Sequence, residues 1–303
     1  MTLLDYIRHW LVSVKKFHVK ASTYDRLITS LEALQGYPIA SKAVSDILPE
    51  DCEDYVKEVT SSGYALTTIK KQMLIVSAPL AYAYEHRHIP FNPAACMKPP
   101  SKVHVQKAKR QIVAYDKEQQ KRLIAVFEKK KYVACDALWF MMETGLRPGE
   151  ILALSKTDVF LDERKMHIHA TMVNLANSKV AYVQEGAKTE TSNRYVPLSP
   201  KAIEILRPLL FNNKRDFLFC NRNGGRLSYE SMRYQCLQIC KEAGVPYHGL
   251  HVWRHTFATN QFYKGTDVKI LSKILGHSET SVTYNIYVHL YGDGFNDMLK
   301  AVS

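Results

Sequence analysis

This sequence has few features of membrane or secreted proteins, because it has no long apolar run, no cysteine pattern typical of disulfides and no apolar core near its first residue. No apolar stretch reaches the roughly 18 residues of a membrane-spanning helix, and the first ten residues, MTLLDYIRHW, carry charges where a signal peptide has an apolar core. The 6 cysteines are scattered along 303 residues, which is typical of reduced thiols and not of a disulfide framework. These absences predict a cytoplasmic protein with no membrane partner.

Acidic residues are scarce relative to basic ones. The chain has 41 Lys and Arg against 29 Asp and Glu, a formal net charge of +12. Because lysine and arginine release counterions when they neutralise phosphates, this balance favours a polyanionic partner, with nucleic acid the first candidate. The chain is otherwise of ordinary globular composition, with 46% hydrophobic and 23% charged residues, and its length indicates two domains.

Residues 1–95 show the periodicity of helices and few segments that favour strands. Apolar residues recur at helical spacing in four stretches, near residues 3–14, 24–34, 49–59 and 65–87. We therefore expect a compact helical bundle. Lys70 and Lys71 in its fourth helix are candidate DNA-contacting residues.

Residues 96–115 differ in composition from the helical stretches before them. Prolines precede a run of basic residues, and there is little apolar periodicity. We interpret this segment as an inter-domain linker. Either it is simply solvated or it lies along a DNA backbone. In the second case the candidate contacts are Lys102, Lys107, Lys109 and Arg110.

Residues 116–303 begin with two helical patterns that lead to the phrase TGLRPGE. Pro148 and Gly149 in this phrase fit a helix stop and restart, which would hold Arg147 at a sharp turn. Glu150 lies three residues beyond Arg147, close enough to pair with a neighbouring cation.

A strand-rich region follows. Alternating runs at 166–173, 179–183 and 194–198 predict short antiparallel strands, and Lys188 falls near the tip of the second connection. After them the helical pattern returns. The predicted fold is therefore mainly α with a small antiparallel β-sheet, in which a helical bundle precedes an α+β domain.

Residues 250–290, which are predicted to form three short helices, contain many proton carriers, cations and phenols. Gly265 and Gly276 stand where left-handed caps end helices, and Thr266 is the predicted N-cap of the middle helix. Five polar groups of this stretch suit a phosphate site better than a core: His251, Arg254, His277, Tyr284 and Tyr287. Periodicity alone does not decide which of the two tyrosines would react.

Two patterns could suggest zinc instead. Cys236 and Cys240 lie near histidines in the sequence, but zinc cysteines usually come in tight loops and not on successive turns of a helix. His251 and His255 are four residues apart, but no glutamate follows His251 as an HExxH site requires, and an arginine stands between them. We therefore expect no metal and no other cofactor.

Five phrases of the second half together resemble the tyrosine recombinase family, and in particular the phage and conjugative-transposon integrases. They are TGLRPGE at 144–150, KTETSNRYVPL at 188–198, HVWRHTFAT at 251–259, LGH at 275–277 and YVHL at 287–290. The resemblance spans residues 110–290 and fills all six family positions in order. It implies that residues 1–95 are the core-binding domain, 96–115 the linker and 116–303 the catalytic domain.

The resemblance also implies an activity, a site-specific DNA recombinase that acts through a 3′-phosphotyrosine and a Holliday junction. The family's nucleophile follows the LGH histidine at a similar interval and precedes another histidine, which selects Tyr287 and leaves Tyr284 as packing. The other implied site residues are Arg147 and Arg254 on the phosphate, Lys188 as general acid, His251 as proton carrier, His277 as supporting donor and Glu150 as an orienting group. Val252 and Trp253 depart from the common family pattern and are expected to point away from the site.

Other interpretations stay open at this point. A catalytically silent DNA-binding protein would be expected to have lost one of the six positions, and none is lost. A type IB topoisomerase shares the chemistry, and a Xer-like resolvase differs from an integrase in the sites that it joins. The family further implies double-stranded DNA sites, a homotetramer on paired sites, and accessory DNA-bending or directionality factors.

Overall fold

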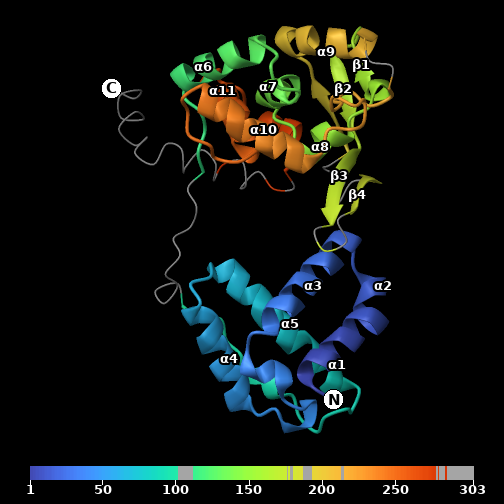
Figure 1. The fold of residues 1–303 in the computed structure, drawn as a ribbon, viewed down its shortest axis with the longest axis vertical. Helices are drawn as coiled ribbons and strands as arrows, with labels where there is room; N and C mark the ends of the chain where they lie inside the picture. Colours follow the sequence, from blue (N-terminus) through green and yellow to red (C-terminus); the bar gives the residue numbers. More distant parts are fainter. Residues whose placement is uncertain are drawn as a thin grey trace. The chain divides into compact units, whose positions relative to one another are not determined.

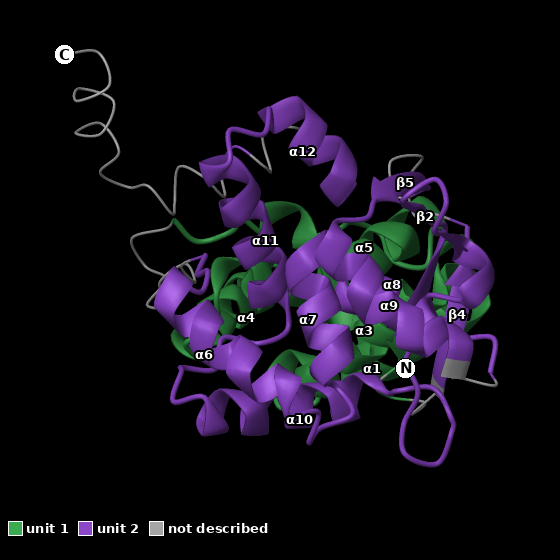
Figure 2. Ribbon diagram, turned by 90° about the horizontal axis from the view of Figure 1, so that it is seen from above, with its two compact units in different colours: residues 1–110, 174–180 green, residues 111–173, 181–303 purple. Residues whose placement is uncertain are grey.

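The computed structural model describes residues 1–101, 112–175, 177, 180–186, 193–212, 215–277, 279 and 284. The chain divides into two compact units, residues 1–110 with 174–180 and residues 111–173 with 181–303, called unit 1 and unit 2 below (Figure 2). Helices dominate and the sheets are small and antiparallel, which confirms the predicted fold class. Within the described ranges no helix is both long enough and apolar enough to cross a membrane.

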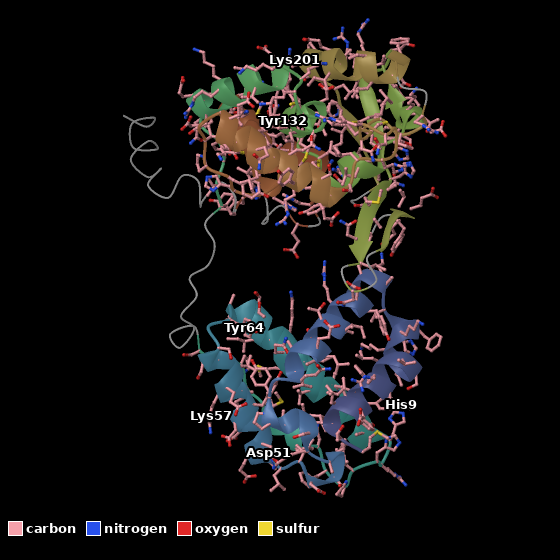
Figure 3. All side chains as sticks on the ribbon, viewed as in Figure 1. His9, Asp51, Lys57, Tyr64, Tyr132 and Lys201 are labelled. Carbon is pink, nitrogen blue, oxygen red and sulfur yellow. The ribbon has the colours of Figure 1, made fainter. Side chains whose placement is uncertain are left out.

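Unit 1 is a set of helices around one apolar core. The side chain of Thr2 accepts a hydrogen bond from the Asp5 amide to begin the first helix, and Leu3, Ile7 and Leu11 are fully buried. The helices are α1 (Leu3–Trp10), α2 (Lys16–His18), α3 (Ala21–Leu34), α4 (Pro49–Ser61) and α5 (Leu66–Glu85), with a π-helical turn at Leu11–Lys15. Shorter 3-10 turns lie at Pro38–Ser41, Val44–Asp46 and Pro93–Cys96. Charged side chains such as that of Lys57 on α4 stand on the surface (Figure 3).

Unit 2 packs its helices around α7 and α11, beside the strands (Figure 1). They are α6 (Lys117–Glu128), α7 (Cys135–Thr144), α8 (Pro148–Ala153), α9 (Pro200–Asn212), α10 (Tyr229–Glu242), α11 (His251–Tyr263) and α12 (Val268–Leu275). α6 begins at a reciprocal cap, in which Asp116 and Gln119 each accept a hydrogen bond from the other's backbone amide. Trp253 of α11 is fully buried, with its ring 5.5 Å from that of Phe127.

The strands form two sheets where one continuous set was predicted. β1 (Val159–Phe160), β2 (Lys165–Ile168) and β5 (Arg194–Pro197) make an antiparallel sheet in the order β1-β2-β5, whereas β3 (Ala170–Leu175) pairs with β4 (Val180–Glu185). The prediction of a single strand over 166–173 was therefore wrong. The reason is that β5 begins at Arg194, opposite Ile168, and the chain beyond Ile168 pairs with β4 instead.

Two glycines fix the connection between α7 and α8. Gly145 ends α7 with φ of 68°, and a Cβ there would lie 2.3 Å from the Phe257 ring. A Cβ on Gly149 would lie 2.4 Å from Oγ1 of Thr171 and 2.8 Å from the carbonyl oxygen of Met172, so α8 approaches β3 closely. A side chain at position 145 would clash with α11, and one at position 149 would clash with β3. The backbone on both sides of Arg147 is thereby held close to its neighbours.

α12 begins and ends at well-defined caps. Its C-terminus is at Gly276, which has φ of 67° in the left-handed region, as predicted. Its N-cap is Asp267, whose side chain accepts hydrogen bonds from the amides of Lys269 and Ile270. The prediction of Thr266 as N-cap was wrong by one residue, since the Thr266 hydroxyl donates to Oε1 of Gln261 instead.

Candidate functional site

Arg147 stands immediately before α8 and contacts two other segments of unit 2. Its backbone amide donates to Oε2 of Glu150 over 2.9 Å, and its Nη1 donates to Oε1 of the same carboxylate over 2.8 Å. Its Nη2 donates to the carbonyl oxygen of Gly276 over 2.7 Å. The side chain remains 34% exposed, so the guanidinium is held in place and still faces solvent.

Arg254 reaches the same place from α11. It is almost fully buried, its Nη1 donates to the carbonyl oxygen of Gly145 over 3.0 Å, and its Nη2 donates to that of Leu275 over 2.7 Å. Burial and the charge of Arg147 lower the pKa of Arg254, and Glu150 opposes this effect. A guanidinium so placed stays charged, since its ordinary pKa is far above neutrality.

A third guanidinium, that of Arg194, completes the cluster. Arg194 is the first residue of β5, and its sequence pattern had predicted only that it belongs to a strand. Its Nε donates to the carbonyl oxygen of Ile274 over 2.7 Å, and its Nη1 and Nη2 donate to the two carboxylate oxygens of Glu150 over 3.0 and 2.9 Å. One sequence signal could have revealed it. Arg194 alternates with the apolar Val196, and both are buried on the same side of β5.

The C-terminus of α12 is the point on which these arginines converge. Three successive carbonyl oxygens, those of Ile274, Leu275 and Gly276, accept from Arg194, Arg254 and Arg147 respectively. The last carbonyls of a helix lack intrahelical partners and carry partial negative charge, so cationic donors suit them. This arrangement positions His277, the next residue, whose amide donates to the carbonyl oxygen of Ser272.

Glu150 is the carboxylate of the cluster. Burial opposes its ionisation, but the hydrogen bond and charge of Arg194, followed by the charge of Arg147 and its backbone hydrogen bond, bring its pKa down to about 2. Glu150 is therefore ionised at neutral pH. The prediction that Glu150 would pair with a neighbouring cation is confirmed by these contacts.

Three histidines lie beside the arginines. His277 is partly buried, and burial together with the charges of Arg254 and Arg147 lowers its pKa to about 3. His251, at the exposed first turn of α11, has a pKa lowered by partial desolvation and by the same two arginines. His255, one turn further along α11, has a pKa lowered to about 4, mainly by burial. All three imidazoles are thus kept neutral next to permanent cations, and neutral imidazoles can accept or donate a proton.

The other predicted site residues are placed as follows. Lys188 and Tyr287 lie outside the described residues, as do Lys102, Lys107, Lys109 and Arg110. Tyr284 is described and is 61% exposed. Lys70 and Lys71 are exposed on α5 of unit 1. Val252 and Trp253, which were expected to point away from the site, are buried in the core of unit 2.

By its charges the arrangement suits an anion. Within the described part of unit 2, the cluster defined by Arg147, Glu150, Arg194 and Arg254 holds three guanidiniums and one carboxylate. Each guanidinium has five N–H donors, so Arg147 and Arg254 keep donors beyond those used by carbonyls and Glu150. Planar forks of this kind match the non-bridging oxygens of a phosphodiester.

The shifted pKa of His255 predicts acid sensitivity of the fold. The pKa of His255 in the folded state, about 4, lies below its ordinary value of 6.5. As the pH falls below 6.5, this imidazole therefore takes up a proton in the unfolded chain but not in the folded one, which lowers the stability of the fold. We expect His255 to account for a loss of roughly 1 to 2 kcal/mol in unfolding free energy between pH 7 and pH 5. Urea unfolding at the two pH values measures this loss.

His255→Gln is expected to remove that part of the pH dependence, whereas the same change at the exposed His18 of α2 serves as the control. An equal loss of stability on acidification in wild type and His255→Gln would show that this imidazole is not the group responsible.

Known proteins resemble this chain across most of its length. The model of the phage integrase family matches residues 114–293. A XerC-like tyrosine recombinase of Caldanaerobacter subterraneus subsp. tengcongensis is 24% identical, over 96% of this chain and 80% of the relative. The transposase from transposon Tn916 of Enterococcus faecalis is also 24% identical, over 90% of this chain and 71% of the relative.

Solved structures share the fold. The integrase of transposon Tn1549, in complex with a circular-intermediate DNA, superposes with a TM-score of 0.80 at 19% identity and covers 100% of both chains. Lambda integrase, in a tetramer bound to a Holliday junction, gives a TM-score of 0.68 at 16% identity, over 94% of this chain and 77% of that one. With the family model covering more than half of the sequence, the chain belongs to the phage integrase family, the tyrosine-type site-specific recombinases that cleave and rejoin DNA.

Proposed function

We propose that the arginine cluster binds the scissile phosphate of DNA, with Arg147 and Arg254 on its non-bridging oxygens. The observation that carries this proposal is the convergence of the two guanidiniums on adjacent carbonyls, those of Gly276 and Leu275. Two forks held side by side stabilise a pentacoordinate phosphorus more than the ground-state diester, because negative charge accumulates there in the transition state.

Tyr287 is the proposed nucleophile and Lys188 the proposed general acid. As the bond from the Tyr287 phenol oxygen to phosphorus forms, the bond from phosphorus to the 5′ oxygen breaks. The phenol proton passes to a neighbouring base, and Lys188 gives a proton to the leaving 5′ oxygen. The product is a 3′-phosphotyrosine and a free 5′ hydroxyl, which conserves the phosphodiester energy for attack by the 5′ hydroxyl of another strand, through a Holliday junction.

The neutral histidines suit the remaining proton transfers. We assign His251 as the proton carrier for the phenol, because a lowered pKa keeps its imidazole able to accept a proton. His277 is the proposed supporting donor to the phosphate through a neutral N–H, which its lowered pKa also favours. Glu150 orients Arg147 by the two hydrogen bonds that it accepts from that residue. None of these steps calls for a cofactor.

The proposed assembly is a homotetramer on two double-stranded DNA sites in the cytoplasm, with accessory DNA-bending or directionality factors. Its support is the likeness in fold to lambda integrase, whose solved tetramer holds a Holliday junction. Native mass spectrometry on paired duplexes counts the protomers. We favour integration and excision of a mobile element, as the Tn916 transposase relative suggests. Xer-type resolution is the second candidate, because the XerC-like relative matches over 96% of this chain.

Covalent trapping tests the proposed chemistry. A duplex is selected for binding from a randomised library, nicked next to the candidate scissile phosphate, and incubated with wild type, Tyr287→Phe and Tyr284→Phe. Wild type and Tyr284→Phe are expected to give a protein–DNA adduct that survives SDS, and Tyr287→Phe to give none, because phenylalanine has no oxygen to attack phosphorus.

Two other results of the trapping experiment would lead to different conclusions. Loss of the adduct only in Tyr284→Phe would move the nucleophile to that residue. A selected duplex that wild type binds but never joins would favour the catalytically silent DNA-binding protein over the recombinase.

Lys70 and Lys71 are proposed to contact DNA phosphates from unit 1, because both are exposed on α5 of a basic chain. Each lost phosphate contact reduces the slope of log binding constant against log salt by about 0.9. The Lys70→Ala, Lys71→Ala double variant is expected to lower the slope by roughly 2 in fluorescence anisotropy titrations. Lys57→Ala, an exposed lysine of the same unit that pairs with Asp54, is the control. A double variant with the wild-type slope would exclude both contacts.

A further inference from the structure

Arg194 is the one arginine of the cluster to which the proposed reaction assigns no role. The residue as a whole is 9% exposed and lies on the buried face of β5. Two parallel hydrogen bonds, of 3.0 and 2.9 Å, join its Nη atoms to the two oxygens of Glu150. Such bidentate, charge-assisted pairs are the strongest hydrogen-bonded contacts between side chains. In this buried pair the positive charge of one guanidinium balances the negative charge of one carboxylate.

Glu150 has a second cationic neighbour on the same oxygens. Arg147 donates to Oε1 from its Nη1 over 2.8 Å and to Oε2 from its backbone amide over 2.9 Å. A single carboxylate can neutralise only one of the two guanidiniums. The more buried of the two is Arg194, since the side chain of Arg147 is 34% exposed and that of Arg194 is 7% exposed. Electrostatic attraction is least screened for the more buried pair.

We propose that Arg194 is the counter-charge of Glu150, and that it thereby leaves the charges of Arg147 and Arg254 available to the scissile phosphate. Arg194 acts through Glu150 and does not touch the phosphate, so it is a positioning residue. This inference rests on the proposed function, in which Arg147 and Arg254 bind that phosphate.

The charge balance of the cluster supports the inference. Three arginines and one glutamate give a net charge of +2. A phosphodiester carries one negative charge, and attack by a phenolate adds a second, so the pentacoordinate transition state carries two. With Arg194 replaced by a neutral residue the cluster falls to +1. Glu150 would then have Arg147 as its only bonded cation, and its negative charge would neutralise the guanidinium that faces solvent.

The hydrogen bond from Arg194 to α12 adds a positional role. Its Nε donates to the carbonyl oxygen of Ile274, two residues before Gly276, the acceptor of Arg147. β5, α8 and α12 are therefore joined by Arg194 and Glu150. A lysine at position 194 would keep the charge but could not make all three of these bonds, because an ammonium lacks the planar fork.

Loss of Arg194 has a consequence for pH dependence. Burial raises the pKa of Glu150, and Arg194 is the largest of the groups that lower it. The other cations facing Glu150 are Arg147 from the turn before α8 and Arg254 from α11. Asp158, His167 and His169 line a cavity of about 10 Å³ together with Glu150. Without Arg194 the pKa of Glu150 rises. As the pH falls, Glu150 then takes up a proton and the cluster returns from +1 toward +2.

Single-turnover adduct formation on the nicked duplex tests the inference. Arg194→Met and Arg194→Lys are compared with wild type between pH 5.5 and pH 8, at protein concentrations that saturate the duplex. Arg207→Met, at an exposed position of α9, removes the same charge elsewhere on unit 2 and is the matched control. Thermal unfolding of each variant checks that it is folded.

We expect Arg194→Met to be slower than wild type at pH 7.5 by roughly 10- to 100-fold, as for other groups one contact removed from a reactive centre. Arg194→Lys should recover much of that loss because it keeps the charge. The rate of Arg194→Met divided by that of wild type should rise as the pH falls, since wild type shares every other titrating group. Arg207→Met should match wild type throughout.

Either a rate ratio that stays flat with pH or equal losses in Arg194→Met and Arg194→Lys would reduce Arg194 to a packing residue and overturn the inference. If Arg194→Met does not fold, Arg194→Gln replaces it, because it removes the same charge and keeps a polar side chain. The same rise of the rate ratio with falling pH is then expected, and a flat ratio contradicts the counter-charge. A wild type that forms no adduct overturns the proposed function and this inference together, whereas a flat ratio with a wild-type adduct overturns only the inference.

Discussion

The end of α12 is the structural constraint on which the site depends. A helix leaves its last carbonyls without intrahelical partners, and here Gly276 turns the chain so that three of them face the guanidiniums of Arg147, Arg194 and Arg254. Those arginines come from the turn before α8, from β5 and from α11. The same hydrogen bonds that complete α12 therefore place three cations together, next to His277.

So many like charges are stable together because each has a defined acceptor. Glu150 offsets one positive charge, and backbone carbonyls offset part of the others, which leaves a positive site that DNA phosphate can complete. Burial, together with this positive charge, lowers the pKa of His277 and keeps its imidazole neutral. In the proposed mechanism the arginines hold the permanent positive charge, and the imidazoles carry out the proton transfer.

Local patterns predicted most of the elements, and tertiary contacts decided what they missed. Periodicity and the stops at Gly145 and Gly276 predicted the helices, because these signals act within a few residues. The family resemblance supplied Arg147, Arg254 and Glu150, which the structure brings together. Arg194 was missed because its partners, Glu150 and Ile274, are distant in sequence. The break between β2 and β3 was missed because the position where β5 begins determines it.

The most direct measurement of the central claim changes the charge of the phosphate itself. Adduct formation by wild type, Arg147→Ala and Arg254→Ala is compared on a duplex with the native scissile phosphate and on one with a neutral methylphosphonate there. If the arginines balance phosphate charge, the loss caused by at least one substitution, on the order of 10²- to 10³-fold on native DNA, shrinks on the neutral linkage. Equal losses on both duplexes would contradict the account.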